Sequence, residues 1–195
     1  MLRSNDLFWS RLIKTYLLGV REKVSDLMAW NADATRMPYR MHSEYLHHMF
    51  LKNDLAEGRF LVDEKPVAVS EIDLLLFAVG TETDHVAPWR SVYKLHLLNQ
   101  GDITFVLTSG GHNAGIVSEP GHPGRHFRIA QRNAKKPYVA PDQWSSSATQ
   151  QEGSWWPAYA GWLNSHSGAE SSLPAMGSAR FPVLADAPGL YVRES

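Results

Sequence analysis

The 195-residue sequence contains no cysteine. This absence excludes disulfide bonds, thiolate metal ligands and a cysteine nucleophile within the chain. An excess of charge of either sign is also lacking, because 19 lysine and arginine residues stand against 20 aspartate and glutamate residues. This balance favours neither nucleic acid nor an acidic membrane surface as a partner.

Long apolar runs and targeting signals are missing too. The longest apolar run, residues 72–80, is far shorter than the roughly 20 residues of a membrane-spanning helix. Residues 1–6 do not have the basic-then-apolar layout of a signal peptide. We therefore expect a soluble, cytoplasmic protein without a membrane span.

Two apolar segments predict the core of an α/β fold. Residues 72–80 and 103–107 are almost continuously apolar, as are strands buried on both faces of a parallel sheet. Between them, Pro88 suits the first turn of a helix with an apolar stripe. Strand, helix and strand in this order form the unit of a parallel α/β sheet. Two strands are too few for a self-sufficient sheet, so the pattern predicts part of a larger fold.

The rest of the chain divides around this unit. Helices are predicted over residues 6–28 and 38–55, and a hairpin over residues 60–69. In the second helix, the apolar side chains expected to face inward are Met41, Tyr45, Met49 and Leu51. After residue 115 the sequence is loop-like, apart from a short helix that opens at residues 153–157. The parts expected are a helical segment over 1–58, an α/β core over 59–132 and an aromatic-rich tail over 133–195.

An acidic residue follows the first predicted strand, and a histidine follows the second. Asp84 and His112 thus lie beyond the carboxyl ends of strands, where ligands bind in open α/β sheets. An acid followed by a histidine is the second half of the nucleophile–acid–histidine order of α/β-hydrolases. In such a pair the carboxylate orients the histidine, which takes a proton from a weak nucleophile. The alternative is that Asp84 and His112 are ordinary solvated loop residues without a catalytic role.

Five stretches of the sequence, in the same order, resemble class I polyhydroxyalkanoate synthases. They are LRSNDL at residues 2–7, WNADATRMP at 30–38, DHVAPW at 84–89, SGGHNAG at 109–115 and GSWWP at 153–157. The resemblance implies the C-terminal part of an α/β-hydrolase fold, incomplete on its own. Residues 1–58 would be a helical cap segment, and residues 59–132 would hold the last strand–helix–strand units of the parallel sheet.

The resemblance also implies a reaction and roles for residues. Such synthases polymerise (R)-3-hydroxyacyl-CoA into a polyester and release coenzyme A, so the CoA thioester is a substrate and no cofactor is expected. His112 would be the general base that activates a cysteine thiol. Asp84 would be the acid partner, which in the family activates the 3-hydroxyl group of the acyl unit. His85 would support Asp84 or contact the substrate.

The sequence departs from the family at the nucleophile. Neither the Gly-x-Cys-x-Gly-Gly elbow of the family nor a Gly-x-Ser-x-Gly elbow is present. We therefore expect an acid/base-bearing part of a synthase that is inactive alone. Its expected partners are the acyl-CoA, the polyester chain and either a second copy, bound through the cap, or a complementing N-terminal half. The alternatives are an inactive module that associates with intact synthase or polyester granules, and part of an esterase or depolymerase.

Other histidines and tryptophans have simpler interpretations. His122 and His126 have metal-ligand spacing, but Pro123 and Gly124 between them favour a loop, and no metal site is expected. The tryptophans at 144, 155, 156 and 162 are interpreted as core and surface packing rather than as a polymer-binding surface.

Overall fold

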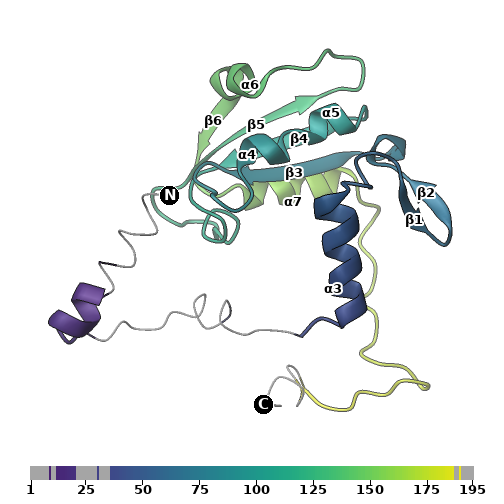
Figure 1. The fold of residues 1–195 in the computed structure, drawn as a ribbon, viewed down its shortest axis with the longest axis horizontal. Coiled ribbons are helices and arrows are strands. Elements are labelled where there is room, and N and C mark those ends of the chain that lie inside the picture. Colours follow the sequence, from purple (N-terminus) through teal and green to yellow (C-terminus); the bar gives the residue numbers. More distant parts are fainter. Residues whose placement is uncertain (1–8, 10–11, 21–29, 31–35, 187–188, 190–195) are drawn as a thin grey trace. The chain divides into compact units, whose positions relative to one another are not determined.

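The computed structural model describes residues 9, 12–20, 30, 36–186 and 189 (Figure 1). They belong to two compact units, residues 1–67 and residues 68–195. Most of the helix predicted over 6–28 lies outside the described residues, which include one π-helical turn, η1 (Ile13–Leu17). The LRSNDL stretch and most of WNADATRMP also lie outside the described residues. The predicted division into 1–58, 59–132 and 133–195 stays a prediction.

The first unit contains a helix and a hairpin. Helix α3 (Tyr39–Tyr45) continues as the π-helical segment η2 (Leu46–Leu51). Strands β1 (Phe60–Val62) and β2 (Lys65–Val67) pair antiparallel, and the two residues between them have positive φ angles, as in a tight type I′ turn. The hairpin is thus confirmed. The inward orientation predicted for Met41, Tyr45 and Leu51 is wrong, because the described part of this unit leaves these side chains exposed.

The second unit is built on a four-stranded mixed sheet with the order β3-β4-β5-β6. Strands β3 (Leu76–Thr81) and β4 (Ile103–Thr108) run parallel, in a register that pairs Leu76 with Ile103 and Thr81 with Thr108. Strand β5 (His126–Arg132) is antiparallel to β4, and β6 (Thr149–Glu152) is antiparallel to β5. The chain is therefore of the α/β class, with the predicted strand–helix–strand unit and two antiparallel strands that the sequence reasoning missed.

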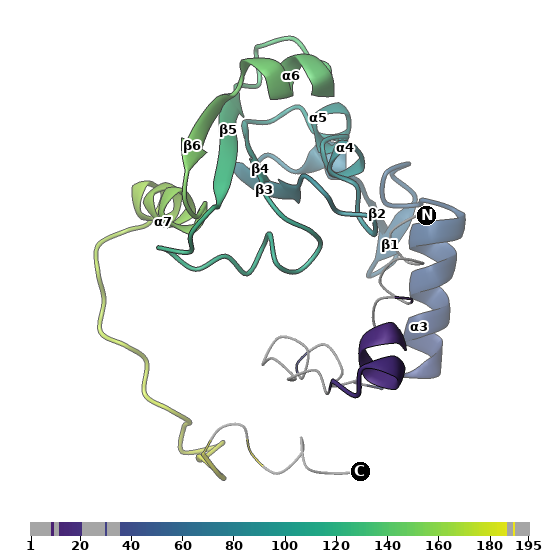
Figure 2. The same ribbon diagram turned by 90° about the vertical axis from the view of Figure 1, so that its left-hand side faces the viewer.

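Helices cover both faces of this sheet, as Figure 2 shows. On one face, α4 (Trp89–Val92) and α6 (Pro141–Ser147) bring Trp89 and Trp144 against Phe105 and Leu107 of β4. Helix α5 (Leu95–Leu98) follows α4 in the connection to β4, and the short 3-10 turn η3 (Val69–Glu71) precedes β3. On the other face, α7 (Trp156–Ser165) packs beside a cluster formed by Val106, Phe127 and Trp155. Alternate residues of β4 thus point to opposite faces, as the pleat of a strand requires.

Strand β3 begins four residues later than predicted. Ile72, Leu74 and Leu75 are exposed, and the carbonyl of Ile72 accepts a hydrogen bond from the buried amide of Asn99 at 2.9 Å. The backbone at Ile72 therefore bonds to the turn before β4 and does not join the sheet.

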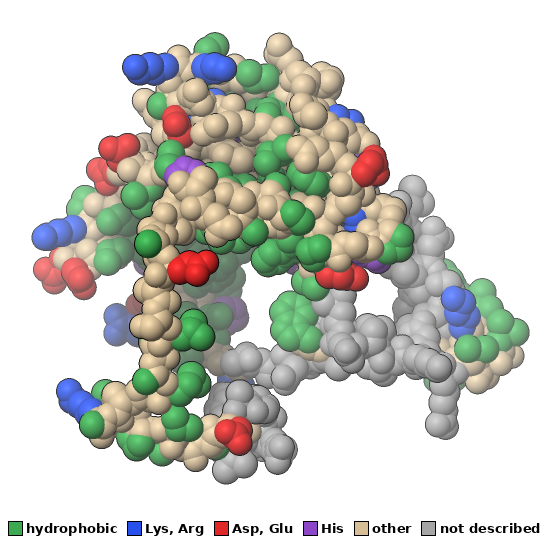
Figure 3. All heavy atoms as spheres, turned by 180° about the vertical axis from the view of Figure 1, so that it is seen from behind, with side chains coloured by type: hydrophobic (Ala, Val, Ile, Leu, Met, Phe, Trp, Pro, Cys, Tyr) green, Lys and Arg blue, Asp and Glu red, His purple; other side chains and the backbone are tan. Residues whose placement is uncertain are grey.

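Within the described residues, no helix is long and apolar enough to cross a bilayer. On the face seen in Figure 3, acidic and basic side chains are both scattered over the described part of the surface, and neither kind forms a large patch.

Candidate active site

The candidate site lies where the parallel strands β3 and β4 end. Beyond the last pair of the ladder, the N–H of Glu82 donates to the carbonyl of Thr108 at 2.9 Å, and the N–H of Thr83 donates to the carbonyl of Gly110 at 3.0 Å. The loops that follow the two strands therefore leave the sheet side by side. This places residues 84 and 112, which are 28 positions apart in the chain, within reach of each other.

Asp84 and His112 make a direct contact. The Nδ1 atom of His112 lies 2.9 Å from Oδ2 of Asp84. The side chain of Asp84 is only 7% exposed, whereas that of His112 is 44% exposed. The other carboxylate oxygen, Oδ1, accepts the backbone N–H groups of Val86 and Ala87, each at 2.8 Å. The carboxylate is thus held by its own loop and presents one oxygen to the histidine.

The ionisation of Asp84 determines how the pair is protonated. Burial by itself raises the pKa of this carboxyl, but the N–H of Ala87, the His112 ring and the N–H of Val86 outweigh burial and bring the pKa down to about 2. At neutral pH the carboxylate is therefore ionised and can only accept hydrogen bonds. In the neutral form of His112, Nδ1 therefore carries the proton and Nε2 carries the lone pair. A neutral histidine held in this way is arranged to accept a proton at Nε2.

The glycines of the histidine loop are required by its shape. Gly110 has a φ of 107°, which side chains rarely permit. A Cβ atom at Gly115 would lie 2.6 Å from Cγ2 of Thr81 and 2.9 Å from the carbonyl oxygen of Gly111. A side chain at residue 115 would therefore force Thr81 or the loop backbone to shift. Gly111 is different, because a Cβ atom there would meet its nearest neighbour, Oγ1 of Thr83, at 3.7 Å.

Sequence reasoning assigned no such contacts to three groups in or near the loops that carry the pair. Thr81 Oγ1 donates a hydrogen bond to Oδ2 of Asp84 at 3.3 Å. His126, at the start of β5, lies 3.3 Å from both carboxylate oxygens of Glu82. The tryptophans of the GSWWP stretch bind carbonyls of the His112 loop and are considered further below. A hydroxyl on the last residue of β3 could have been noticed in the sequence, but the His126–Glu82 pair depends on β5, which was not predicted.

The remaining residues singled out in the sequence lie apart from this contact. His85 is exposed, and no hydrogen bond or ion pair in the described part of the chain joins it to Asp84 or His112. His122 lies in a turn, with its Nδ1 atom 3.9 Å from Oε1 of Glu119. Within the ranges that the structure describes, His122 and His126 do not belong to a common cluster of metal ligands. Among the described residues, no group of three or more histidine, aspartate or glutamate side chains is arranged to hold a metal ion.

Three known proteins that are similar to this chain are named as poly(3-hydroxyalkanoate) polymerases. This chain is 37% identical over 195 residues to a poly(3-hydroxyalkanoate) polymerase of Methylorubrum extorquens, and the match covers 99% of this chain and 31% of that protein. It is 36% identical over 194 residues to the poly(3-hydroxyalkanoate) polymerase subunit PhaC of Cupriavidus necator, with 98% and 32% covered. For poly(3-hydroxyalkanoate) polymerase 2 of Ectopseudomonas oleovorans the identity is 35% over 193 residues, with 98% and 34% covered.

The match has a defined extent. No protein-family model matches the sequence. The chain spans about one third of the length of the curated relatives it matches, and this third is their C-terminal portion. The similarity covers nearly the whole chain and includes both loops of the candidate site. The chain therefore corresponds to the C-terminal portion of poly(3-hydroxyalkanoate) polymerases.

Proposed function

We propose that this chain is the acid/base-bearing part of a polyhydroxyalkanoate synthase, an acyltransferase that polymerises (R)-3-hydroxyacyl-CoA into a polyester and releases coenzyme A. The observation that carries the proposal is the 2.9 Å contact between His112 and Asp84 at the ends of two parallel strands. The similarity of the chain to the C-terminal portion of poly(3-hydroxyalkanoate) polymerases supports it independently. The nucleophile is a cysteine thiol supplied from outside this sequence, which has no cysteine.

The finer fold is part of the proposal. Strands β3 and β4 are the last parallel strands of an α/β-hydrolase sheet, and further strands of that sheet pair beside β3, which is an edge strand here. Residues 1–58 serve as a helical cap, and residues 133–195 as the tail. A second copy, bound through the cap, or a complementing N-terminal half completes the active enzyme. The surface of polyester granules in the cytoplasm is the proposed site of action.

The geometry of His112 suits two proton transfers. In acylation, Nε2 takes the proton of the cysteine thiol, the thiolate attacks the thioester carbonyl, and the bond from that carbonyl to the coenzyme A sulfur breaks. The proton then passes from His112 to the departing coenzyme A thiolate. In elongation, Nε2 takes the proton of a 3-hydroxyl group, whose oxygen attacks the acyl thioester on the cysteine. An ester bond forms, the bond from the acyl carbonyl to the cysteine sulfur breaks, and the proton passes from His112 to that sulfur. Because His112 is partly exposed while Asp84 is buried, the histidine is the member of the pair that substrate can reach.

We assign Asp84 the role of orienting His112. Both of its oxygens are already engaged, one by Val86 and Ala87 and the other by His112 and Thr81. A carboxylate with a pKa near 2 is also a weak base for a hydroxyl group. The family resemblance implies that Asp84 activates the 3-hydroxyl group directly. The engaged oxygens and the low pKa favour an orienting role instead. His85, exposed beside Asp84, has room to contact substrate.

A complementation experiment tests the proposed function. The portion of the Cupriavidus necator polymerase that this chain does not match is fused ahead of residue 1, and release of coenzyme A from 3-hydroxybutyryl-CoA is followed with a thiol reagent. The chain alone releases none above buffer, whereas the fusion does, and its activity depends on the nucleophilic cysteine. The intact polymerase is the positive control. A folded fusion without turnover refutes the proposal, and turnover by the chain alone indicates a hydrolase that uses water or a serine.

A further inference from the structure

The GSWWP stretch, at the start of α7, binds the loop that carries His112. The indole Nε1 of Trp155 donates to the carbonyl of Gly115 at 3.2 Å, and the indole Nε1 of Trp156 donates to the carbonyl of Ile116 at 2.9 Å. The hydroxyl of Ser154 donates to the carbonyl of Ser118. Three successive residues thus hold the backbone of one loop, across a separation of 36 to 40 positions in the sequence.

The anchoring side of this contact is fixed to the sheet. The Trp155 side chain is buried in the cluster with Val106 and Phe127, and its ring is stacked on that of Trp156 with the centroids 4.7 Å apart. The two indoles therefore have positions set by β4 and β5. A carbonyl that accepts from them is held relative to the same sheet that holds Asp84.

Burial alone does not explain the contact of Trp156. Its side chain is 40% exposed, so its N–H could be satisfied by water. It is directed instead at the carbonyl of Ile116, within the turn where the N–H of Gly115 donates to Gly111 and the N–H of Ile116 donates to Asn113. That turn begins at the residues on either side of His112.

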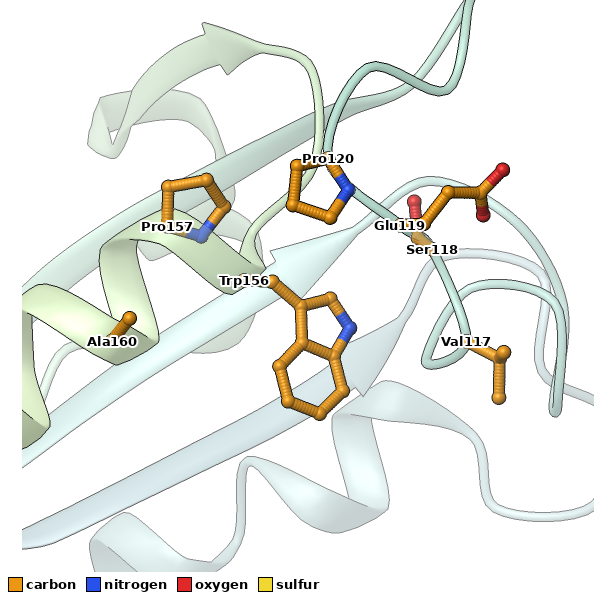
Figure 4. A pocket seen from close by; sticks show the side chains of 7 residues that line it. All are labelled: Val117, Ser118, Glu119, Pro120, Trp156, Pro157 and Ala160. Carbon is orange, nitrogen blue, oxygen red and sulfur yellow. The ribbon is translucent and has the colours of Figure 1, made fainter.

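Farther along the loop, an apolar cavity of about 460 Å³ lies between the loop and α7. It is lined by Val117, Ser118, Glu119, Pro120, Trp156, Pro157 and Ala160, as Figure 4 shows. Beside this cavity, the loop is attached by the hydrogen bonds of Ser154, Trp155 and Trp156 and by the packing of Ile116 against the cluster that contains Trp155.

We infer that Trp155 and Trp156 are positioning residues, whose indole N–H groups hold the His112 loop so that Nδ1 of His112 faces Asp84. They touch the loop backbone and not the reacting groups. Their importance for catalysis rests on the proposed function, whereas the positioning itself is a property of this chain. The protonation site of the His112 ring reports on it directly, because an ionised Asp84 keeps the proton on Nδ1. A ring released from Asp84 changes toward the Nε2-protonated form, which predominates in an unrestrained histidine.

The test is the tautomer of His112 in the full chain at slightly alkaline pH, read from the ring ¹⁵N chemical shifts by NMR. The variants are Trp156→Phe and Trp155→Phe/Trp156→Phe, which remove N–H donors and retain aromatic rings. We expect a substantial change from the Nδ1-protonated form toward the Nε2-protonated form, larger in the double variant. Trp162→Phe is the matched control on the same helix, because Trp162 packs on Phe77 and Tyr159, and it should leave the tautomer unchanged.

Two further comparisons make the result decisive. In an Asp84→Ala background the tautomer has already changed, and Trp156→Phe should then add nothing. A backbone amide spectrum like that of the parent shows that each variant is folded. If the double variant does not fold, the single variant at the partly exposed Trp156 decides. A folded Trp156→Phe chain with the parent's His112 tautomer overturns the inference, whether or not the fused enzyme is active.

Discussion

The Nδ1 atom of His112 lies 2.9 Å from Oδ2 of Asp84, and this contact joins a buried, ionised carboxylate to a partly exposed ring. The carboxylate is fixed by the N–H groups of Val86 and Ala87, and it orients the histidine ring through the Nδ1 atom. In the neutral ring, the Nε2 atom then carries the lone pair. The following predictions depend on this arrangement and on the packing that maintains it.

The role of Asp84 can be separated from that of a hydroxyl-activating base. In the fusion with a cysteine-bearing portion, Asp84→Asn should slow acylation and elongation alike, because the amide no longer holds the proton on Nδ1 of His112. The single-turnover release of coenzyme A measures acylation, and polymer formation measures elongation. If acylation is preserved while elongation is lost, the carboxylate acts on the hydroxyl group, and the orienting role is wrong.

Two glycines of the same loop should respond differently to an added methyl group. Gly115→Ala should lower the free energy of unfolding by about 1–3 kcal/mol, because the new Cβ atom meets Thr81 and the carbonyl of Gly111. Gly111→Ala, where the space is open, should change it by less than about 0.5 kcal/mol. Urea denaturation of both variants provides the comparison. Equal stability of the two would contradict the packing described for this loop.

A buried histidine in the core predicts a specific loss of stability in mild acid. Burial lowers the pKa of His96 to about 4, with Arg132 acting in the same direction. As the pH falls from about 6.5 toward 4, the unfolded chain gains a proton here and the folded chain does not. The free energy of unfolding should therefore fall in this window, by up to about 1.4 kcal/mol per pH unit.

The dependence on His96 is measured by repeating denaturation between pH 7 and pH 5. His96→Phe should flatten the pH dependence, because the phenyl ring has no proton to gain and can pack against Tyr93 and Phe105 as the imidazole does. The exposed His85, replaced by glutamine, is the control and should leave the slope as in the parent. An unchanged slope in His96→Phe would show that other groups cause the loss.

The parallel pair and its two loops were predictable from sequence because they rest on local patterns. The apolar run at residues 103–107 coincides with β4, and the acid and histidine after the two strands meet as parallel strand ends require. The start of β3 was placed too early, since apolarity alone does not show that Ile72 is engaged by Asn99. An apolar side chain in a turn and one in a strand look the same in the sequence.

Other parts of the fold and site left weaker traces. Strand β6 consists of Thr149, Gln150, Gln151 and Glu152, all exposed, so it carries no apolar pattern that could reveal a strand. In β5, Phe127 and Ile129 alternate with His126 and Arg128, but this alternation covers only four residues between two loop-like segments. The contacts of Trp155 and Trp156 are made to backbone carbonyls, which any residue possesses, so no sequence pattern identifies the partners.

The central claim is that His112 is the base for acyl transfer, and the rate of coenzyme A release by the fused enzyme tests it most directly. His112→Gln should lower this rate by on the order of 10²–10⁴-fold, because an amide cannot take the thiol proton. His85→Ala, a change in the neighbouring loop outside the hydrogen-bonded pair, should cause a much smaller loss. A folded His112→Gln fusion that releases coenzyme A at the parent's rate would contradict the account.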